Sequence, residues 1–494
     1  MKQRVAMVAA CIGGALGACS FAPRYTRPTT QAPPAAYQED VGDWRQAQPD
    51  DTQRRGPWWE IFNDPQLNQL ETQVTNANQD IKATFARLQQ ARAQTRIARS
   101  GYFPTLTAGP TVTRARQSKN SPTFNDTLHQ PYNDFALDAD FSYELDVWGR
   151  VRNSVAAARA SEQASAADLA VLDLDVHAEL ASDYFMLRSQ DAQQELLDRT
   201  VVDYRRALEL TQNLYDGGAG VLADVDQAKA QLETAQTQAA DMRLSRSQTE
   251  HAIADLLGES ASTFKINTRP LLLDVLPPAI DPGLPSALLE RRPDVAAAER
   301  RVAAANAQIG VARAAYFPVF SLLGSAGFES TSVSNWVTAP SRLWSIGPSA
   351  VLTVFDGGLH RAQSAQAHAA YDEQIADYRG AVLSAYHDVE DNLSALHYLA
   401  QESISEAAAV VATAGALEQA QYRYQGGLVT YLEVVTAENA ALGARLSAAN
   451  IQLRRMVASV LLVKALGGGW QQPAPPSQAN QPLANIQSPS PAAP

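Results

Sequence analysis

The chain has 494 residues, a length that could hold about three ordinary globular domains. Its composition argues for another architecture, because aromatic residues make up only 7% and Ala, Gln, Leu and Arg recur in long stretches without Pro or Gly. Small residues in long amphipathic runs are typical of helices packed side by side. The net charge of −12, without a basic cluster interleaved with aromatic residues, argues against nucleic acid as a partner.

The N-terminus has the pattern of a signal peptide over residues 1–18. Two basic residues precede an apolar run from Val5 to Leu16, which is too short to span a membrane. Small residues then precede Cys19, an arrangement that resembles the lipobox of bacterial lipoproteins. An ordinary cleaved signal with an incidental Cys is the alternative. We expect Cys19 to carry a covalent lipid and residues 19–55 to form a lipid-anchored N-terminal segment.

The cysteine count supports a chain without disulfides. Cleavage would remove Cys11, which leaves Cys19 as the only cysteine and excludes an intrachain disulfide. Outside the signal peptide we find no apolar run of about 18 residues, so no transmembrane helix is expected. A membrane protein without such helices has to use a β-barrel.

The strongest internal signal is a duplication. The segment 98–104, which ends in Tyr-Phe-Pro, returns as 312–318, and the segment 215–218, which ends in Gly-Gly, returns as 424–427. These landmarks keep their order, so each half of the chain is predicted to be one long structural repeat.

Each repeat is predicted to contain a helix, then a pair of strands, then two long helices joined at the Gly-Gly turn. The first repeat, 56–268, has a helix at about 64–100, strands within about 103–147 and a long helical pair at 149–258. The second repeat, 269–470, has a helix at about 287–315, strands within about 317–355 and a long helical pair at 357–467. The remaining residues, 471–494, are rich in Pro and carry no charge, which predicts a disordered tail.

One strand of the first pair alternates between apolar and acidic residues. The apolar face comprises Phe135, Leu137, Ala139, Phe141, Tyr143 and Leu145. The opposite face comprises Asp134, Asp138, Asp140, Ser142, Glu144 and Asp146. The corresponding strand of the second repeat places Ile346, Pro348, Ala350, Leu352 and Val354 on one face. Two soluble hairpins with one wet face are the alternative, but an acidic row suits the water-filled lumen of a barrel.

The number of strands predicts an oligomer. Two repeats give four strands per chain, whereas the smallest transmembrane barrels have about eight. Four strands alone would leave two open edges in lipid, where each unpaired backbone group is costly. Two chains would supply eight strands and three chains twelve.

The long helices have equal lengths in the two repeats. Gly149 and Tyr215 are 66 positions apart, as are Gly358 and Tyr424. At about 1.5 Å per residue, each run reaches roughly 100 Å. Equal lengths are what the wall of a quasi-symmetric tube requires. A two-stranded coiled coil is the alternative, but the runs lack a sustained Leu or Ile heptad seam.

These features resemble the TolC-like outer-membrane efflux lipoproteins of the NodT or OprM type, which serve resistance-nodulation-division pumps. The resemblance covers about 56–470 and is carried by the lipobox, the duplicated landmarks and the heptapeptide Glu-Leu-Asp-Val-Trp-Gly-Arg at 144–150. It implies an α+β membrane protein that forms a homotrimer, with a twelve-stranded β-barrel in the outer membrane and a helical barrel across the periplasm. It also implies an equatorial belt, here at about 259–286 and after 467.

The resemblance assigns roles to the Gly-Gly turns. Gly217 and Gly426 are expected to end their helices in the left-handed conformation. Each turn would form the periplasmic tip, where the channel contacts its adaptor protein. The contact residues are expected to be Gly217, Gly218, Gly426 and Gly427.

The resemblance also places a gate at this tip. Asp224 and Glu433 would line the aperture, and Tyr424 would bind Asp224 in the closed state. The alternative is that both acids face water at helix N-termini. OprM-like relatives carry Asp where this chain has Thr436, which weakens the expected ring of negative charge.

No catalytic motif or nucleotide-binding glycine pattern is found, so we expect no enzyme activity and no cofactor besides the lipid on Cys19. His387, Glu390 and Asp391 share a helical face but are interpreted as a solvated surface rather than a metal site.

The expected function is a passive outer-membrane conduit that exports small toxic compounds or drugs. Its partners would be outer-membrane lipid, a periplasmic adaptor and an inner-membrane pump. A structural coiled-coil lipoprotein that spans the envelope is the alternative.

Overall fold

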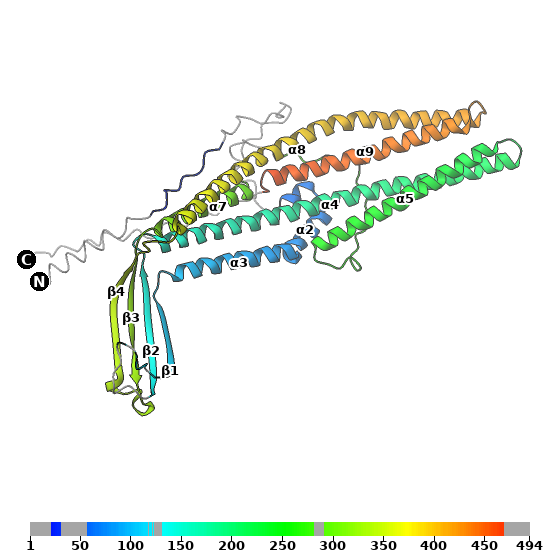
Figure 1. Ribbon diagram of the computed structural model, residues 1–494. Coiled ribbons are helices and arrows are strands. Elements are labelled where there is room, and N and C mark those ends of the chain that lie inside the picture. The colour runs from blue at the N-terminus through cyan, green and yellow to red at the C-terminus, as the bar shows by residue number, and fades with distance from the viewer. Residues whose placement is uncertain are drawn as a thin grey trace, which may run out of the picture.

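The computed structural model describes residues 21–30, 57–116, 118–120, 122, 131–280 and 291–468. The predicted signal peptide, Cys19 and the tail 471–494 lie outside the described residues. The described part is elongated and bent, with a small sheet at one end that points away at a steep angle from the extended helices (Figure 1).

The strands form one antiparallel sheet in the order β1-β2-β3-β4 (Figure 1). Their bounds are β1 Thr105–Ala115, β2 Tyr132–Leu145, β3 Val319–Ser330 and β4 Arg342–Val351. Because β2 pairs with β3, the strand pairs of the two repeats join into a single four-stranded sheet. The strand that was expected to continue to about 355 ends at Val351, so Leu352 and Val354 do not extend its face.

The register gives the sheet one apolar and one polar face. Across β1 and β2, Leu106 lies opposite Phe141 and Val112 lies opposite Phe135. On the other face, Thr107 and Ser325 flank Asp140 from the two neighbouring strands. The predicted alternation is therefore present across the sheet, with the carboxylates of β2 gathered on the polar face.

The long helices of the second repeat have the same lengths as those of the first repeat. Their bounds are α2 Pro65–Ala77, α3 Gln79–Ser100, α4 Arg150–Asp216, α5 Leu222–Leu256, α7 Pro293–Ala314, α8 Leu359–Gln425 and α9 Tyr431–Ala465, with a short 3-10 helix η1 at Trp58–Phe62. Helices α4 and α8 both have 67 residues, and α5 and α9 both have 35. The predicted duplication thus sets the dimensions of the fold.

The helix predicted at about 64–100 is two helices, because the backbone turns at Asn78. This residue has a ψ of 132° and its side chain accepts hydrogen bonds from the amides of Asp80 and Ile81, which caps α3. Its amide group also donates to the Leu256 carbonyl at 2.9 Å, which ties the break to the end of α5.

The helices continue the order of the strands. Next to the sheet, α3, α4, α7 and α8 lie side by side, and they connect to β1, β2, β3 and β4 respectively (Figure 1). Farther away, α5, α4, α9 and α8 form the next level. We call this single layer of four elements the wall. It has two free edges, one along β1, α3 and α5 and the other along β4 and α8.

Two apolar cores hold the middle of the wall. One joins α7, α8 and α9, and the other joins α2, α4, α5 and part of α9. Among the described helices, α9 is long and apolar enough to cross a membrane by its length and composition, but half of its apolar stretch is buried inside the chain. Its packing between α4 and α8 accounts for its apolar character.

A buried polar pair fixes α2 to α4 within the second of these cores. The His177 ring nitrogen lies 2.5 Å from a Glu71 carboxyl oxygen, and the Trp59 ring stacks on the imidazole at 4.4 Å. Burial raises the pKa of Glu71 to about 9 and lowers the pKa of His177 to about 4. Burial thus favours the neutral form of both groups.

The segment 259–280 is the described part of the predicted belt, and a charged network fastens it to the wall. Asp191 is 1% exposed and accepts hydrogen bonds from Arg188 at 3.0 Å, from Arg246 at 2.6 Å and from the amide of Arg269 at 2.8 Å. Both guanidinium groups also donate to belt carbonyls, at Asn267 and Ile266.

We predict that Asp191→Asn destabilises the helical part by about 3–5 kcal/mol, because two largely buried guanidinium groups would lose their carboxylate. Asp198→Asn is the matched control, since Asp198 also lies on α4 and binds an α5 arginine, Arg243, but both side chains are about half exposed. Its cost should stay below about 1 kcal/mol. Denaturant unfolding followed by far-ultraviolet circular dichroism measures both changes, and equal midpoints for the two variants would refute the assignment.

Candidate functional site at the helix turns

The turns between the long helices are built alike in the two repeats. In the first, the Gly218 amide donates to the Tyr215 carbonyl at 2.9 Å and the Ala219 amide donates to Leu214 at 2.8 Å. In the second, Gly427 and Leu428 donate to Tyr424 and Arg423 in the same way. This pair of bonds is the Schellman motif, which satisfies carbonyl groups at a helix end.

The left-handed residues are the second glycines of the turns, so the expectation for Gly217 and Gly426 was wrong. Gly218 has a φ of 74° and Gly427 a φ of 71°, whereas Gly217 and Gly426 have φ near −80° and stay in the helical region. The reason is that the amide of the first glycine still donates an α-helical hydrogen bond to the carbonyl four residues before it. The left-handed conformation is therefore adopted one residue later, by the second glycine.

Near the turns a small apolar cluster joins the two helical hairpins α4–α5 and α8–α9. We call it the tip cluster; its buried members are Ala228, Ala420, Tyr431, Val434 and Val435. They come from α5, α8 and α9, and side chains of α4 pack against them. The tip cluster is much smaller than either core in the middle of the wall. The hairpins are thus held together near the turns by few side chains.

The structure brings Tyr424 and Asp224 close together without a direct bond. Burial, followed by the negative charge of Asp224, raises the pKa of the Tyr424 hydroxyl. The Tyr424 ring packs against the ring of Tyr431 at 5.5 Å. Among the described residues no hydrogen bond joins Tyr424 to Asp224, so their contact in this chain is electrostatic and indirect.

Glu433 has a partner that the sequence did not indicate. It forms an ion pair with Arg423, which joins the last turn of α8 to the first turn of α9. Both side chains are about half exposed, so the pair stabilises the turn only weakly and is screened by salt. Thr436 donates its hydroxyl to the Leu432 carbonyl at 2.8 Å, within its own helix.

A second group of polar side chains lies between the hairpins and was missed at the level of sequence. The Tyr204 hydroxyl of α4 donates to the Asn439 side chain of α9 at 3.5 Å. The Tyr431 hydroxyl and one Glu438 carboxylate oxygen are buried without a hydrogen-bond partner in the described structure. Burial, followed by the charge of Asp203, raises the pKa of Glu438 to about 7. The sequence could have indicated this group through the spacing of Tyr431 and Glu438, because residues seven positions apart lie on the same face of a helix.

The N-terminal segment 21–30 lies along the second repeat. The Phe21 ring stacks on Phe317 at 4.4 Å, where the sheet meets the helices. The Tyr25 hydroxyl donates to the Glu299 carboxylate at 2.7 Å. Cys19 precedes Phe21 by two positions in the chain and lies outside the described residues.

The charged side chains around His387, which share a predicted helical face, contact different partners. His387 lies 3.3 Å from Asp391, with both side chains largely exposed, whereas Asp388 forms an ion pair with Arg292 at 2.9 Å. In the part of the chain that the structure describes, no group of three or more His, Cys, Asp or Glu side chains could hold a metal ion.

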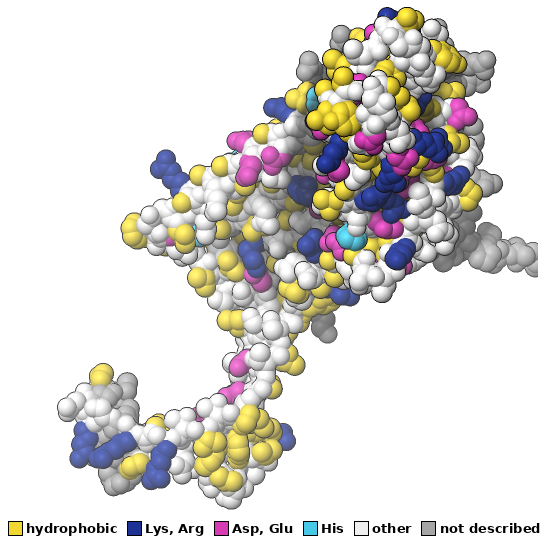
Figure 2. Space-filling view, turned by 90° about the vertical axis from the view of Figure 1, so that its right-hand side faces the viewer, with side chains coloured by type: hydrophobic (Ala, Val, Ile, Leu, Met, Phe, Trp, Pro, Cys, Tyr) yellow, Lys and Arg dark blue, Asp and Glu magenta, His cyan; other side chains and the backbone are white. Residues whose placement is uncertain are grey.

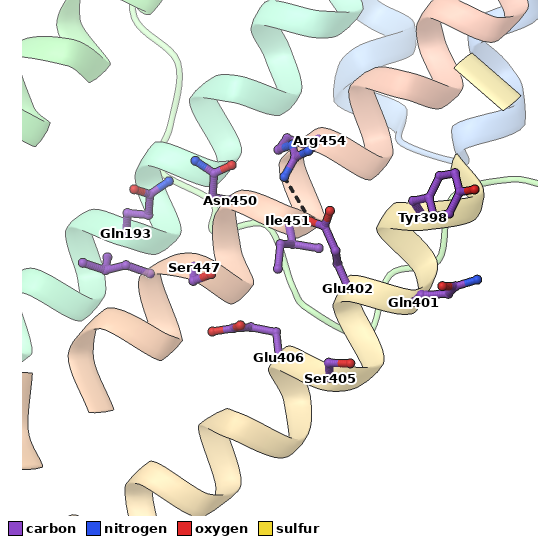
Figure 3. Close-up of a pocket in the computed structure, with 11 residues that line it drawn as sticks. Gln193, Tyr398, Gln401, Glu402, Ser405, Glu406, Ser447, Asn450, Ile451 and Arg454 are labelled. Carbon is purple, nitrogen blue, oxygen red and sulfur yellow. Dashed lines mark hydrogen bonds and ion pairs between the residues drawn. The ribbon is translucent and has the colours of Figure 1, made fainter. Parts of the chain in front are cut away.

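An open groove lies between α8 and α9 midway along the helices (Figure 3). It has a volume of about 770 Å³. Glu402 and Arg454 form an ion pair across it at 3.1 Å, while Gln193 reaches it from α4. Its lining is mostly polar and lacks the apolar enclosure of a typical small-molecule site.

Comparison with known proteins identifies the family. The sequence profile of the outer membrane efflux protein family matches residues 70–259 and 284–468. Outer membrane protein OprJ of Pseudomonas aeruginosa is 34% identical over 480 residues, which cover 95% of this chain and 97% of OprJ. Toluene efflux pump outer membrane protein TtgF of Pseudomonas putida is 31% identical over 464 residues, which cover 92% of this chain and 95% of TtgF.

A solved structure agrees with the sequence comparisons. The structure of the outer-membrane channel OprN matches with a TM-score of 0.82 at 32% identity, and the match covers 92% of this chain and 100% of that one. The predicted resemblance and fold class are confirmed. The chain belongs to the outer membrane efflux protein family and is an outer-membrane channel of a Gram-negative efflux system.

Proposed function

We propose that three copies of the chain close into one continuous duct, with a twelve-stranded barrel in the outer membrane and a helical barrel in the periplasm. The observation that carries this proposal is the shared order of the wall, in which four strands continue into four helices at each level. A wall with two free edges joins copies edge to edge, so that β4 of one chain pairs with β1 of the next.

Three copies fit the proposed duct better than two. An eight-stranded barrel has an interior that side chains fill, whereas barrels with more strands leave room for an aqueous channel. The polar face of the sheet, with Asp138 and Asp140 among its residues, would then line the lumen. This arrangement also gives the polar face a role that it would lack in a coiled-coil spacer.

The duct would work through its shape, as a passive conduit for small toxic compounds or drugs. The periplasmic adaptor would contact the turns at Gly217, Gly218, Gly426 and Gly427, and the inner-membrane pump would supply the energy. A lipid on Cys19 would anchor the N-terminus close to the barrel, because Phe21 docks where the sheet meets the helices.

The first test is the mass and conductance of the oligomer extracted in detergent. We expect native mass spectrometry to show a trimer, and planar bilayers to show channels with a small conductance in the closed state. A lipid-sized mass increment on the N-terminal peptide that begins at Cys19 is also expected, and Cys19→Ala should abolish it. A monomer or dimer that forms no channel would contradict the proposed duct.

The gate is tested by the double variant Tyr424→Phe and Asp224→Ala. Removing the hydroxyl and the nearby carboxylate should remove the electrostatic contact between α8 and α5 and raise the open probability about fivefold, equivalent to about 1 kcal/mol. Tyr215→Phe is the matched control, because Tyr215 holds the corresponding place in the first repeat and is 40% exposed. Single-channel recording gives the result, and identical open probabilities for all three proteins would place the gate elsewhere.

A second test uses the pH dependence of the contact between the hairpins. The pKa of Glu438 is raised from 4.5 to about 7, so its stabilising contribution is complete below about pH 4.5 and is lost as the pH rises through 7. Glu438→Gln stays neutral and should remove on the order of 2 kcal/mol of pH dependence between these limits. The measurement is the difference in unfolding midpoint between wild type and variant across pH 4–8. Parallel curves would mean that Glu438 is solvated in the assembled channel.

A further inference from the structure

The positively and negatively charged residues of the sheet lie on opposite faces, and the positive ones gather at one end of the strands. The described strands contain two arginines, Arg114 on β1 and Arg342 on β4. They contain five carboxylates, namely Asp134, Asp138, Asp140 and Glu144 on β2 and Glu329 on β3. The register places all five carboxylates on the polar face, and it places both arginines on the apolar face.

Both arginines lie at the end of the sheet that is farthest from the helices. Arg114 follows Val112 in the apolar row of β1, and Arg116 comes next in the same alternation just after the strand ends. On β4 the apolar row runs from Arg342 through Trp344 to Ile346. All three arginines are exposed, and the described structure shows no ion pair for any of them.

The neighbouring side chains suit the boundary between hydrocarbon and headgroups. Trp344 is 76% exposed, Ile346 and Val112 are each 64% exposed, and these side chains share the face that would contact lipid. Trp is enriched at membrane interfaces because its ring is apolar and its N–H is polar. Figure 2 shows Lys and Arg side chains gathered beside apolar side chains at the lower end of the molecule, which is the far end of the sheet.

We propose that Arg114 and Arg116 of one chain, together with Arg342 of the next, form a site for the phosphate groups of an outer-leaflet lipid. The inference rests on the proposed closure of three chains, since β1 and β4 are opposite edges of one sheet and meet only between copies. The antiparallel pairing of these edges would bring the far ends of both strands together. Guanidinium groups bind phosphate in a bidentate manner, and no described carboxylate of the strands shares their face.

The binding experiment uses the purified full-length trimer and diphosphoryl lipid A, with the same glycolipid stripped of its phosphates as the comparison. We expect the trimer to bind only the phosphorylated form strongly. The double variant Arg114→Gln and Arg116→Gln, and separately Arg342→Gln, should each weaken binding, the former by about tenfold or more, since each basic residue near an anionic lipid contributes about 1 kcal/mol.

Two control variants separate a specific site from general charge. Arg96→Gln with Arg99→Gln removes the same charge from an exposed part of α3 and should leave binding unchanged. Arg114→Lys with Arg116→Lys keeps the charge but loses the bidentate geometry, so binding should fall less than in the Gln double variant and more than in the α3 control variant.

The outcomes distinguish this site from the duct itself. Trimer mass and single-channel conductance should be the same in every variant, whether or not the lipid binds. Equal binding of the phosphate-free glycolipid, or an equal loss in the α3 variant, would overturn the phosphate site and leave the duct intact. Binding of Arg342→Gln at wild-type strength would overturn the sharing of the site between neighbouring chains.

Discussion

The free edges of the sheet are the constraint on which the rest of this architecture depends. An unpaired backbone N–H or C=O in hydrocarbon costs several kcal/mol, and β1 and β4 each present a row of such groups. The chain cannot satisfy these groups by itself, because its four strands form an open sheet in which the edge strands β1 and β4 are not neighbours. Pairing with further copies removes both edges at once, and the helices must then follow the same order so that the edges meet along their whole length.

This constraint explains why the two repeats agree so closely in length. A closed wall has to keep its levels aligned, and helices α4 and α8, with 67 residues each, place both turns at the same distance from the sheet. Each repeat also contains a buried arginine that fixes the middle of the wall. Arg188 binds Asp191 in the first repeat, and Arg292 binds Asp294 and Asp388 in the second. Burial of these groups is tolerated because each guanidinium meets a carboxylate and further acceptors.

The repeat, the strand alternation and the helix lengths could be predicted because they depend on period and spacing in the sequence. The break at Asn78 could not, because Asn is compatible with both a helix and a cap, and the choice depends on a bond to Leu256 far along the chain. The partner of Glu433 was missed for a similar reason. Arg423 lies on the preceding helix, and the Schellman turn determines that the two side chains meet.

The distribution of packing along the wall suggests how a passive duct can open. Large cores in the middle hold α4, α8 and α9 firmly, whereas the tip cluster contains only small or medium side chains and two tyrosines with polar ends. Burying one such apolar side chain contributes about 1.5–3 kcal/mol, so separating the hairpins near the turns costs far less than unfolding the wall. Unpaired polar atoms at Tyr431 and Glu438 reduce that cost further. In the proposed duct, the contact between the hairpins near the turns would therefore be the part of the fold that a binding partner shifts with modest binding energy.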